Sequence, residues 1–499
     1  MHCDDARRRG GSATATKRGA SKDVEASPYS QLQAVVPIEH GEPHPNNRGF
    51  LSVNVSMSNE TSIEVTSSRD NAGSSGAYVI AVTAPAFRLS DTAFAIEDAF
   101  SYHLRELKLQ LEGHVGKIIL VAPELSREDF DRNPSLGVIT ADEGIEMVPT
   151  YPVDASAKEF WIRHVPRLLS VFNRTIRQAD VVHTGMSHDI WRPMLLLLNI
   201  IAWGHRKHSL FFVDIDFRRN TQRFRQLGIW SRKSYVVNRL LHDPLRWLQV
   251  WLAVRLSSLV LLKSPDLVRD FGGGRASVKN FWDTAHSAEQ VLTDGELANR
   301  LTWLSDETKP LQLVYFGRLV AYKGINLAID AIRLARSRGN DIRLTIIGDG
   351  PELPALQRQV DDAKLSEAVT FTPAVKYGEP LFRLLSNFHA SIACPLVEDT
   401  PRSAFDAMAR GLPIVAFNLD YFNGLAEMSG AVNTAEWPSA EKLADAFVAL
   451  DKDRARLTDQ ARKAVAFASA NTQQIWMERR HAWLMEYVLD ATPATASSR

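Results

Sequence analysis

The sequence has almost no cysteine, no net charge and no long apolar run, and each deficit excludes a class of protein. Two cysteines in 499 residues, Cys3 and Cys394, can form neither a disulfide framework nor a Cys-rich zinc site, which predicts a reducing, cytoplasmic compartment. Lys plus Arg and Asp plus Glu both number 58, so the global basic bias of a dedicated nucleic-acid binder is absent. The longest apolar stretch, Met194–Trp203, is about half of a membrane span.

The chain is too long for one ordinary domain and begins with a polar segment. Residues 1–75 are rich in Ser, Thr, Gly, Asn and charge, so we predict a disordered tail there, and another at 491–499. Translation from Met57 would remove most of the first tail. The arginines near the N-terminus have no apolar segment behind them, so they do not form a secretory signal.

Short apolar runs separated by helical stretches predict two doubly wound α/β domains, each with a parallel sheet. We place a Rossmann-like N-terminal domain at 76–290, a second at 291–472 and a helix at 473–490. The stretch 93–111 is expected to be one amphipathic helix, and Gly339 to end another. The strand-like runs are 77–82, 117–121, 179–183 and 210–213, then 313–316, 344–347, 369–371, 391–393 and 413–416. Two such domains are expected to face a cleft that binds ligands.

Two cations follow the first strand of the second domain. Arg318 and Lys323 lie in the run that begins at Gly317, directly after a strand and before a helix. Fixed cations beside free helix N–H groups suit a diphosphate, although two solvated surface cations would have the same pattern. The turn Gly348-Asp349-Gly350 after the next strand is common loop chemistry and is weak evidence by itself.

Paired acids stand near the start of a later predicted helix. Thr400 is the expected N-cap, Pro401 the first helical residue, and Gly411 the residue past the end. Glu398 then lies in the preceding loop and Asp406 on the helix. Such carboxylates can accept hydrogen bonds from vicinal hydroxyls, while the helix N-terminus offers N–H groups to an anion. The alternative is an ordinary capped helix with solvent-facing acids.

Taken together, these segments resemble a known family. Residues 311–417 resemble the C-terminal half of a retaining family 4 glycosyltransferase of the GT-B fold. The resemblance rests on three runs in the same order: FGRLVAYKG, IIGDGPE, and an E-x7-D segment that ends AMARGLPIVAF. The resemblance implies that Arg318 and Lys323 neutralise the donor diphosphate, and that Glu398 faces the donor sugar. Asp406 stands where the family has a Glu for the ribose, so that contact is expected to be longer or shifted. The family's glycine after the third strand is absent at 371–375.

Further donor-binding candidates are the residues that flank this constellation, Gly317, Thr400, Pro401 and Arg402. The cations and helix N-terminus can stabilise a leaving nucleoside diphosphate, so no metal or other cofactor is expected. In the first domain, many members of the family carry His-x-His where this chain has His183 and Gly185. Either His183 or the nearby His188 is a candidate catalytic residue, and a structural role for each stays open.

Asp214-Ile215-Asp216 follows a strand and has the Asp-x-Asp pattern that binds a divalent metal in GT-A transferases. The diphosphate site of the second domain makes such a metal unnecessary, and matches this short often arise by chance. A metal-dependent transferase using these two acids is therefore an alternative rather than our first expectation.

The segment 218–255 is basic and aromatic, with nine Lys or Arg against the single acid Asp243. The tryptophans Trp230, Trp247 and Trp251 alternate with aliphatic residues. This pattern fits a surface that rests on an anionic membrane, and equally a helical pair packed on the sheet.

The sequence therefore predicts a cytoplasmic enzyme that transfers a sugar from a nucleotide sugar to a glycan or lipid-linked acceptor. A location at the inner face of the membrane stays open. By resemblance the pathway would be exopolysaccharide or surface polysaccharide biosynthesis. A non-catalytic nucleotide-sugar binder in such a system is the alternative of another class, because fold alone does not fix a reaction.

Overall fold

The computed structural model describes residues 76–132, 136–187 and 189–489, all of which belong to one compact unit. The predicted tails 1–75 and 491–499, and His188, lie outside these residues. Among the described helices, none combines the length and the apolarity needed to cross a bilayer.

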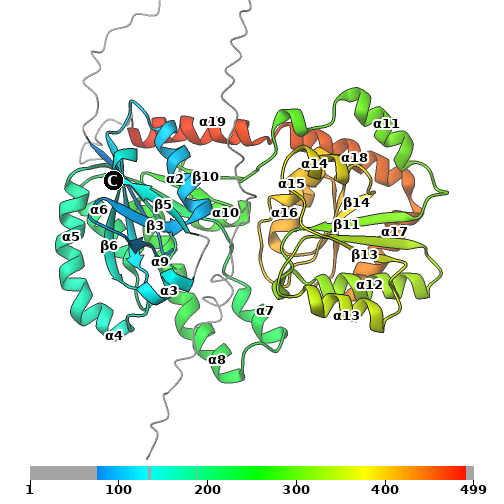
Figure 1. Ribbon diagram of the computed structural model, residues 1–499, viewed down its shortest axis with the longest axis horizontal. Coiled ribbons are helices and arrows are strands. Elements are labelled where there is room, and N and C mark those ends of the chain that lie inside the picture. Colours follow the sequence, from blue (N-terminus) through cyan, green and yellow to red (C-terminus); the bar gives the residue numbers. More distant parts are fainter. Residues whose placement is uncertain (1–75, 133–135, 188, 490–499) are drawn as a thin grey trace, which may run out of the picture. The chain divides into compact units, whose positions relative to one another are not determined.

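The first domain is built on a seven-stranded parallel sheet in the order β10-β9-β8-β7-β1-β4-β6 (Figure 1). Its strands are β1 (Ala77–Ala81), β4 (Lys117–Glu124), β6 (Ile145–Pro152), β7 (Ala179–Gly185), β8 (His208–Val213), β9 (Leu259–Leu262) and β10 (Val278–Asn280). The four predicted strands coincide with β1, β4, β7 and β8. The strands β6, β9 and β10 were not predicted.

Alternate residues of this sheet enter two different cores, as the pleat of a strand requires. Val79 packs with Leu168 of α5 (Val165–Arg177) and Leu198 of α6 (Met194–Gly204) on one face. On the other face, Tyr78 belongs to the core that includes residues of α2 (Asp98–Gln110) and of the C-terminal η6 (Met485–Leu489). The segment η6 packs on β7 and β8. Helices cover both faces, which explains why β1 and β9 are apolar throughout.

The helix predicted over 93–111 is wrong in its first part. Residues Ala93–Glu97 form β3, which pairs antiparallel with β2 (Phe87–Arg88) and β5 (Leu136–Thr140), and only Asp98–Gln110 is the helix α2. The partner β5 lies far along the chain, so a local helical periodicity could not reveal this pairing.

The second domain holds a six-stranded parallel sheet in the order β13-β12-β11-β14-β15-β16. Its strands are β11 (Leu311–Phe316), β12 (Ile342–Ile347), β13 (Val369–Thr372), β14 (Ala390–Ala393), β15 (Ile414–Phe417) and β16 (Val432–Ala435). The five predicted strands are confirmed to within two residues at each end, and β16 is additional. Gly339, at φ 84°, follows the end of α12 (Ile325–Ser337), as predicted.

Helix α12 contacts both α13 (Leu353–Asp362) and α17 (Ala440–Lys452), and α15 (Ser403–Ala409) packs on α18 (Arg454–Ser469). The remaining α-helices are α3 (Arg127–Arg132), α4 (Ala157–Glu159), α7 (Asn220–Gln226), α8 (Arg232–Val237), α9 (Asp243–Leu256), α10 (Pro265–Gly272), α11 (Asp294–Leu304), α14 (Glu379–Leu385), α16 (Asp420–Ser429) and α19 (Gln473–Leu484). Shorter helical turns are η1 (Ala141–Glu143), η2 (Phe160–His164), η3 (Asn238–His242), η4 (Ala288–Gln290) and η5 (Ala321–Lys323).

Each sheet has one point at which the direction of strand addition reverses. In the first sheet it lies between β1 and β7, and in the second between β11 and β14. The loops that leave neighbouring strands there diverge, and open α/β sheets bind ligands at the resulting crevice. Three predicted site residues lie at these two points. His183 belongs to β7, whereas Arg318 follows β11 and Glu398 follows β14.

The loops that follow β11 and β12 lie directly against each other. The Leu319 N–H donates to the Asp349 carbonyl oxygen over 2.9 Å, and the Glu352 N–H donates to the Leu319 oxygen over 3.0 Å. This approach requires glycine, because a Cβ on Gly348 would lie 2.0 Å from the carbonyl oxygen of Gly317. The Gly-Asp-Gly turn, weak evidence in the sequence, thus holds the loop that carries Arg318.

We expect Gly348→Ala to lower the free energy of unfolding by on the order of 2–4 kcal/mol, since the new methyl collides with backbone at a φ of 146°. The matched control is Gly295→Ala in α11, where a Cβ meets nothing within 4 Å, and it should be neutral or slightly stabilising. Denaturant unfolding of both variants checks this, and equal stability of the two would contradict the assigned role of Gly348.

Candidate functional site

The loop after β11 presents two cations, Arg318 and Lys323. Lys323, in η5, lies with its Nζ 2.5 Å from Oδ2 of Asp399, and both side chains are largely buried. Burial opposes the charge on Lys323, but Asp399 and neighbouring tyrosines together raise its pKa above the ordinary value. Arg318 is half-buried, and its carbonyl oxygen accepts a hydrogen bond from the Tyr315 hydroxyl over 2.8 Å.

The carboxylate of Glu398 is buried and fully engaged. Its Oε1 lies 2.6 Å from Nη1 of Arg223 on α7, and it also accepts the N–H groups of Asp420 and Tyr421 at the start of α16 over 3.1 and 3.4 Å. Burial raises the pKa of Glu398, while the charge of Arg223 lowers it. The backbone N–H of Glu398 donates to Oδ1 of Asn220, one turn before Arg223.

The helix that carries Asp406 begins later than the sequence predicts. It starts at Ser403 with Arg402 as its N-cap, so the assignments of Thr400 as N-cap and Pro401 as first helical residue are wrong, and Asp406 lies in the first turn. The Thr400 hydroxyl instead donates to the carbonyl oxygen of Asp214 over 3.4 Å, a contact that no local pattern could predict. Gly411, at φ 66°, follows the helix end, as predicted.

Asp406 is buried and accepts a hydrogen bond from the Tyr377 hydroxyl over 3.1 Å. Burial raises the pKa of Asp406 to about 7, against the smaller opposing effects of Tyr377 and of the Arg402 charge. The carboxyl therefore exists partly in its neutral, proton-donating form near neutral pH.

His183 lies near the carboxyl end of β7, and its Nδ1 is 3.0 Å from the hydroxyl of Tyr78. Burial, followed by the charge of Arg480, lowers the pKa of His183 to about 3, so the ring is neutral at physiological pH. The ring still keeps partial solvent exposure. When the Tyr78 hydroxyl donates to Nδ1, the ring proton resides on Nε2, which can then donate to a ligand.

The two residues of the Asp-x-Asp pattern make different contacts. Asp216 is buried and receives both Nε and Nη2 of Arg218, which also pairs with Asp270. Asp214 offers its backbone oxygen to Thr400. Within the described ranges, no group of three or more His, Cys, Asp or Glu side chains is arranged to hold a metal ion.

Several residues of the site escaped the sequence analysis. Asn220 and Arg223 were interpreted only as parts of a basic segment, yet their spacing on one helix face lets both reach Glu398. Asp399 is adjacent to Glu398 in sequence, but its partner Lys323 is known only from the fold. Tyr377, which binds Asp406, follows β13 in a loop without a recognisable motif.

The arrangement places cations, backbone N–H groups and a buried carboxylate at the switch point of the second sheet. The loops after β11 and β14 meet through the Lys323–Asp399 pair, with Glu398 in the segment between β14 and α15 and Asp406 in the first turn of α15. This chemistry can bind an anion next to a group with several hydroxyls.

Residues 303–464, which make up most of the second domain, match the family described as glycosyl transferases group 1. The chain is 26% identical over 181 residues to alpha-D-kanosaminyltransferase of Streptomyces kanamyceticus, covering 35% of this chain and 46% of that protein. It is 25% identical to alpha-monoglucosyldiacylglycerol synthase of Streptococcus pneumoniae, covering 72% of this chain and 77% of that protein. It spans less than half of the first curated relatives it matches, 35–46% of their length.

A solved structure of Anabaena Alr3699/HepE in complex with UDP has the same architecture. The TM-score is 0.51 at 15% sequence identity, and the alignment covers 82% of this chain and 98% of that one. The predicted fold class is therefore confirmed, because the described chain has the two parallel-sheet α/β domains of the GT-B fold.

The raised pKa of Asp406 predicts a pH-dependent stability. The folded carboxyl binds its proton more tightly than the unfolded one, so its contribution is present below about pH 4 and is lost as the pH rises through about 7. Asp406→Asn has no charge to bury. From pH 5 to pH 8 we therefore expect its free energy of unfolding to rise relative to that of the wild type, by on the order of 2–4 kcal/mol.

Urea unfolding at both pH values measures this difference. The exposed Asp459→Asn on α18 is the control and should show the same offset from wild type at pH 5 and pH 8. A pH-independent offset for Asp406→Asn would contradict the shifted pKa.

Proposed function

We propose that this protein is a retaining glycosyltransferase of the family 4 type, which moves a sugar from a nucleoside-diphosphate sugar to a glycan or lipid-linked acceptor. The observation that carries the proposal is that Arg318, Lys323 and Glu398 all follow the two strands at the switch point of the second sheet, within the residues that match glycosyl transferases group 1. The UDP bound by the similar Anabaena protein supports a nucleotide donor for this chain.

In the proposed reaction, negative charge grows on the leaving diphosphate as the bond to the sugar breaks. Arg318 and Lys323 oppose that charge from fixed positions, an effect that strengthens in a site from which water is excluded. Lys323 must exchange its partner Asp399 for the diphosphate, so Asp399 keeps the cation in place before the donor arrives.

The other residues act on the sugar and ribose. Glu398 is oriented by Arg223 and by the N-terminus of α16, and in the proposed complex its carboxylate faces the donor sugar. Asp406, protonated in part near neutral pH, faces the ribose hydroxyls, and neutral His183 donates a hydrogen bond on the acceptor side. Retention follows from a front-face displacement that uses no enzymatic nucleophile.

An exposed apolar surface supports a lipid-linked acceptor and peripheral contact with the membrane. Within α8, η3 and α9 and the turn before them, eight large apolar side chains are exposed: Ile229, Val236, Val237, Leu240, Leu241, Leu245, Trp247 and Leu248. Arg232, Lys233 and Arg239 lie among them, and this mixture of exposed apolar and basic side chains suits an anionic bilayer.

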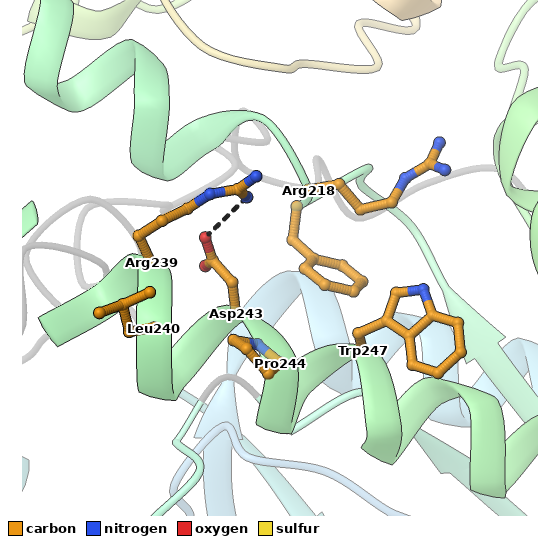
Figure 2. A pocket seen from close by; sticks show the side chains of 7 residues that line it. Arg218, Arg239, Leu240, Asp243, Pro244 and Trp247 are labelled. Carbon is orange, nitrogen blue, oxygen red and sulfur yellow. Dashed lines mark ion pairs between the residues drawn. The ribbon is translucent and has the colours of Figure 1, made fainter. Parts of the chain in front are cut away.

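A cavity of about 360 Å³ opens on this surface, between Phe217 and the η3–α9 segment. Figure 2 shows Leu240, Pro244 and Trp247 along the helix, with the Arg239 guanidinium turned toward Asp243. Its apolar walls and its cations suit an amphiphile. The similar Streptococcus protein, named as the synthase of a glycolipid, agrees with such an acceptor.

Thermal unfolding with a panel of nucleoside diphosphates in excess EDTA tests the donor site. We expect one nucleotide to stabilise the protein by about 2.7 kcal/mol at 100 times its Kd, a rise of several degrees in Tm. Lys323→Gln and Arg318→Gln should abolish that rise and sugar transfer without unfolding the protein. Lys463→Gln, which removes an exposed cation of α18, should keep both.

Each other outcome identifies an alternative. Stabilisation that returns only with Mn²⁺ would favour a metal-dependent transferase using Asp214 and Asp216. Nucleotide binding without transfer to any acceptor would favour a non-catalytic binder in a polysaccharide assembly system, and no nucleotide response at all would contradict the donor site.

Sedimentation with phosphatidylglycerol-containing vesicles tests the membrane contact. We expect Leu240→Gln with Leu248→Gln to weaken binding by about tenfold or more, because each exposed leucine contributes on the order of 1 kcal/mol when it enters the bilayer. Leu109→Gln on α2, which is 63% exposed outside this surface, is the control. Equal vesicle binding by all three proteins would contradict the contact.

A further inference from the structure

Asp283 pairs with two cations from different domains, and its charge also acts on a third cation from the C-terminal helix. Oδ2 of Asp283 accepts a hydrogen bond from Nζ of Lys263 over 3.3 Å. It also accepts hydrogen bonds from Nε and Nη2 of Arg402 over 3.0 and 2.8 Å. Lys263 follows β9 and Asp283 follows β10, whereas Arg402 is the N-cap of α15 in the second domain. We call these residues, with Arg480, the Asp283 cluster.

Arg480 comes from α19 and completes the cluster. Its Cζ lies 4.7 Å from the centroid of the Phe281 ring, and the Lys263 ammonium lies 5.8 Å from the same centroid. Within the described part of the chain, this guanidinium has no carboxylate at ion-pair distance, although it remains half-buried. Burial lowers the pKa of Arg480, Asp283 and Tyr78 oppose that effect, and the charge of Arg402 adds to it.

The charges of the Asp283 cluster do not balance. Lys263, Arg402 and Arg480 contribute three positive charges and Asp283 one negative charge, while the adjacent His183 is neutral. Lys263 has only 9% of its side chain exposed, whereas Asp283 and Arg402 have 29% and 52%. The excess positive charge is thus deep, yet open to solvent on the side of Arg402. A buried excess of charge is costly unless an ion of opposite sign completes it.

We propose that the Asp283 cluster binds a phosphate group carried by the acceptor. Two guanidinium groups offer the paired N–H donors that match phosphate oxygens, and the ammonium adds a point charge. A phosphate monoester carries about 1.5 to 2 negative charges at neutral pH, which would compensate the excess of two positive charges.

The cluster lies on the acceptor side of the proposed reaction. Lys263 and Asp283 follow strands of the first sheet, and Arg480 lies close enough to His183 for its charge to act on the ring. The donor diphosphate has separate cations, Arg318 and Lys323, on a loop of the second sheet. The assignment of the phosphate to an acceptor rests on the proposed function, whereas the phosphate site itself does not.

Thermal titration with glucose 6-phosphate, inorganic phosphate and glucose, at constant ionic strength in NaCl, tests this site. We expect saturable stabilisation of the wild type by glucose 6-phosphate, weaker stabilisation by inorganic phosphate and none by glucose. Arg480→Gln and Arg402→Gln should each raise the apparent Kd for glucose 6-phosphate by about tenfold or more. Both side chains are partly exposed, so the variants should fold, and their Tm without ligand checks that.

Arg479→Gln is the matched control, because it removes the neighbouring, exposed guanidinium of the same helix and should leave the apparent Kd unchanged. Arg318→Gln should keep the phosphate response while it loses the nucleotide response. An unchanged Kd in Arg480→Gln, or loss of the phosphate response in Arg318→Gln, would overturn the site. Equal affinity for the sugar phosphate and for inorganic phosphate would overturn its role in acceptor binding.

A nucleotide titration of the same samples separates this proposal from the previous one. A phosphate response that depends on Arg480 supports the cluster even when no nucleotide stabilises the protein, in which case only the donor assignment fails. A nucleotide response without any response to glucose 6-phosphate would overturn the cluster and leave the donor site intact.

Discussion

The buried ion pair between Arg223 and Glu398 constrains most of the candidate site. It joins α7, which follows β8 of the first sheet, to the loop after β14 of the second, and Glu398 simultaneously accepts the first N–H groups of α16. Both side chains are nearly inaccessible to solvent, so removal of either partner leaves an uncompensated buried charge, which typically costs about 3–5 kcal/mol. The orientation of Glu398 therefore depends on a helix of the other domain as much as on its own loop.

Lys323 and Asp399 repeat this arrangement one residue further along the same loop. The neighbouring carboxylates of Glu398 and Asp399 are held by cations from two different elements, α7 and η5, which fixes the backbone between β14 and α15. A negatively charged ligand that binds there would replace Asp399 as the partner of Lys323. The cation is already in place, so the site needs little rearrangement to receive the proposed diphosphate.

Much of this could be predicted from sequence because it is local. Parallel strands buried on both faces are short apolar runs, and the loops after β11 and β14 carry motifs of fixed spacing, so the second domain was predicted almost strand by strand. The errors arose where a distant partner overrides a local preference. Thr400-Pro401 is a good helix start, but the Thr400 hydroxyl binds the Asp214 carbonyl and the helix begins at Ser403. The segment Ala93–Glu97 has helical periodicity, but it pairs with Leu136–Thr140.

Electrostatics set the firmest limit on prediction from sequence. The cations of the Asp283 cluster come from the loop after β9, the N-cap of α15 and helix α19, and in the sequence each is an ordinary basic residue. Arg480 raises their excess charge from one to two because the C-terminal helix returns to the first domain, where η6 packs against β7 and β8 and the charge of Arg480 acts on His183. The same packing makes the histidine neutral. The helix that closes the fold thus also sets the charge of the crevice, so the C-terminal segment belongs to the candidate site as fully as the motifs of the second domain.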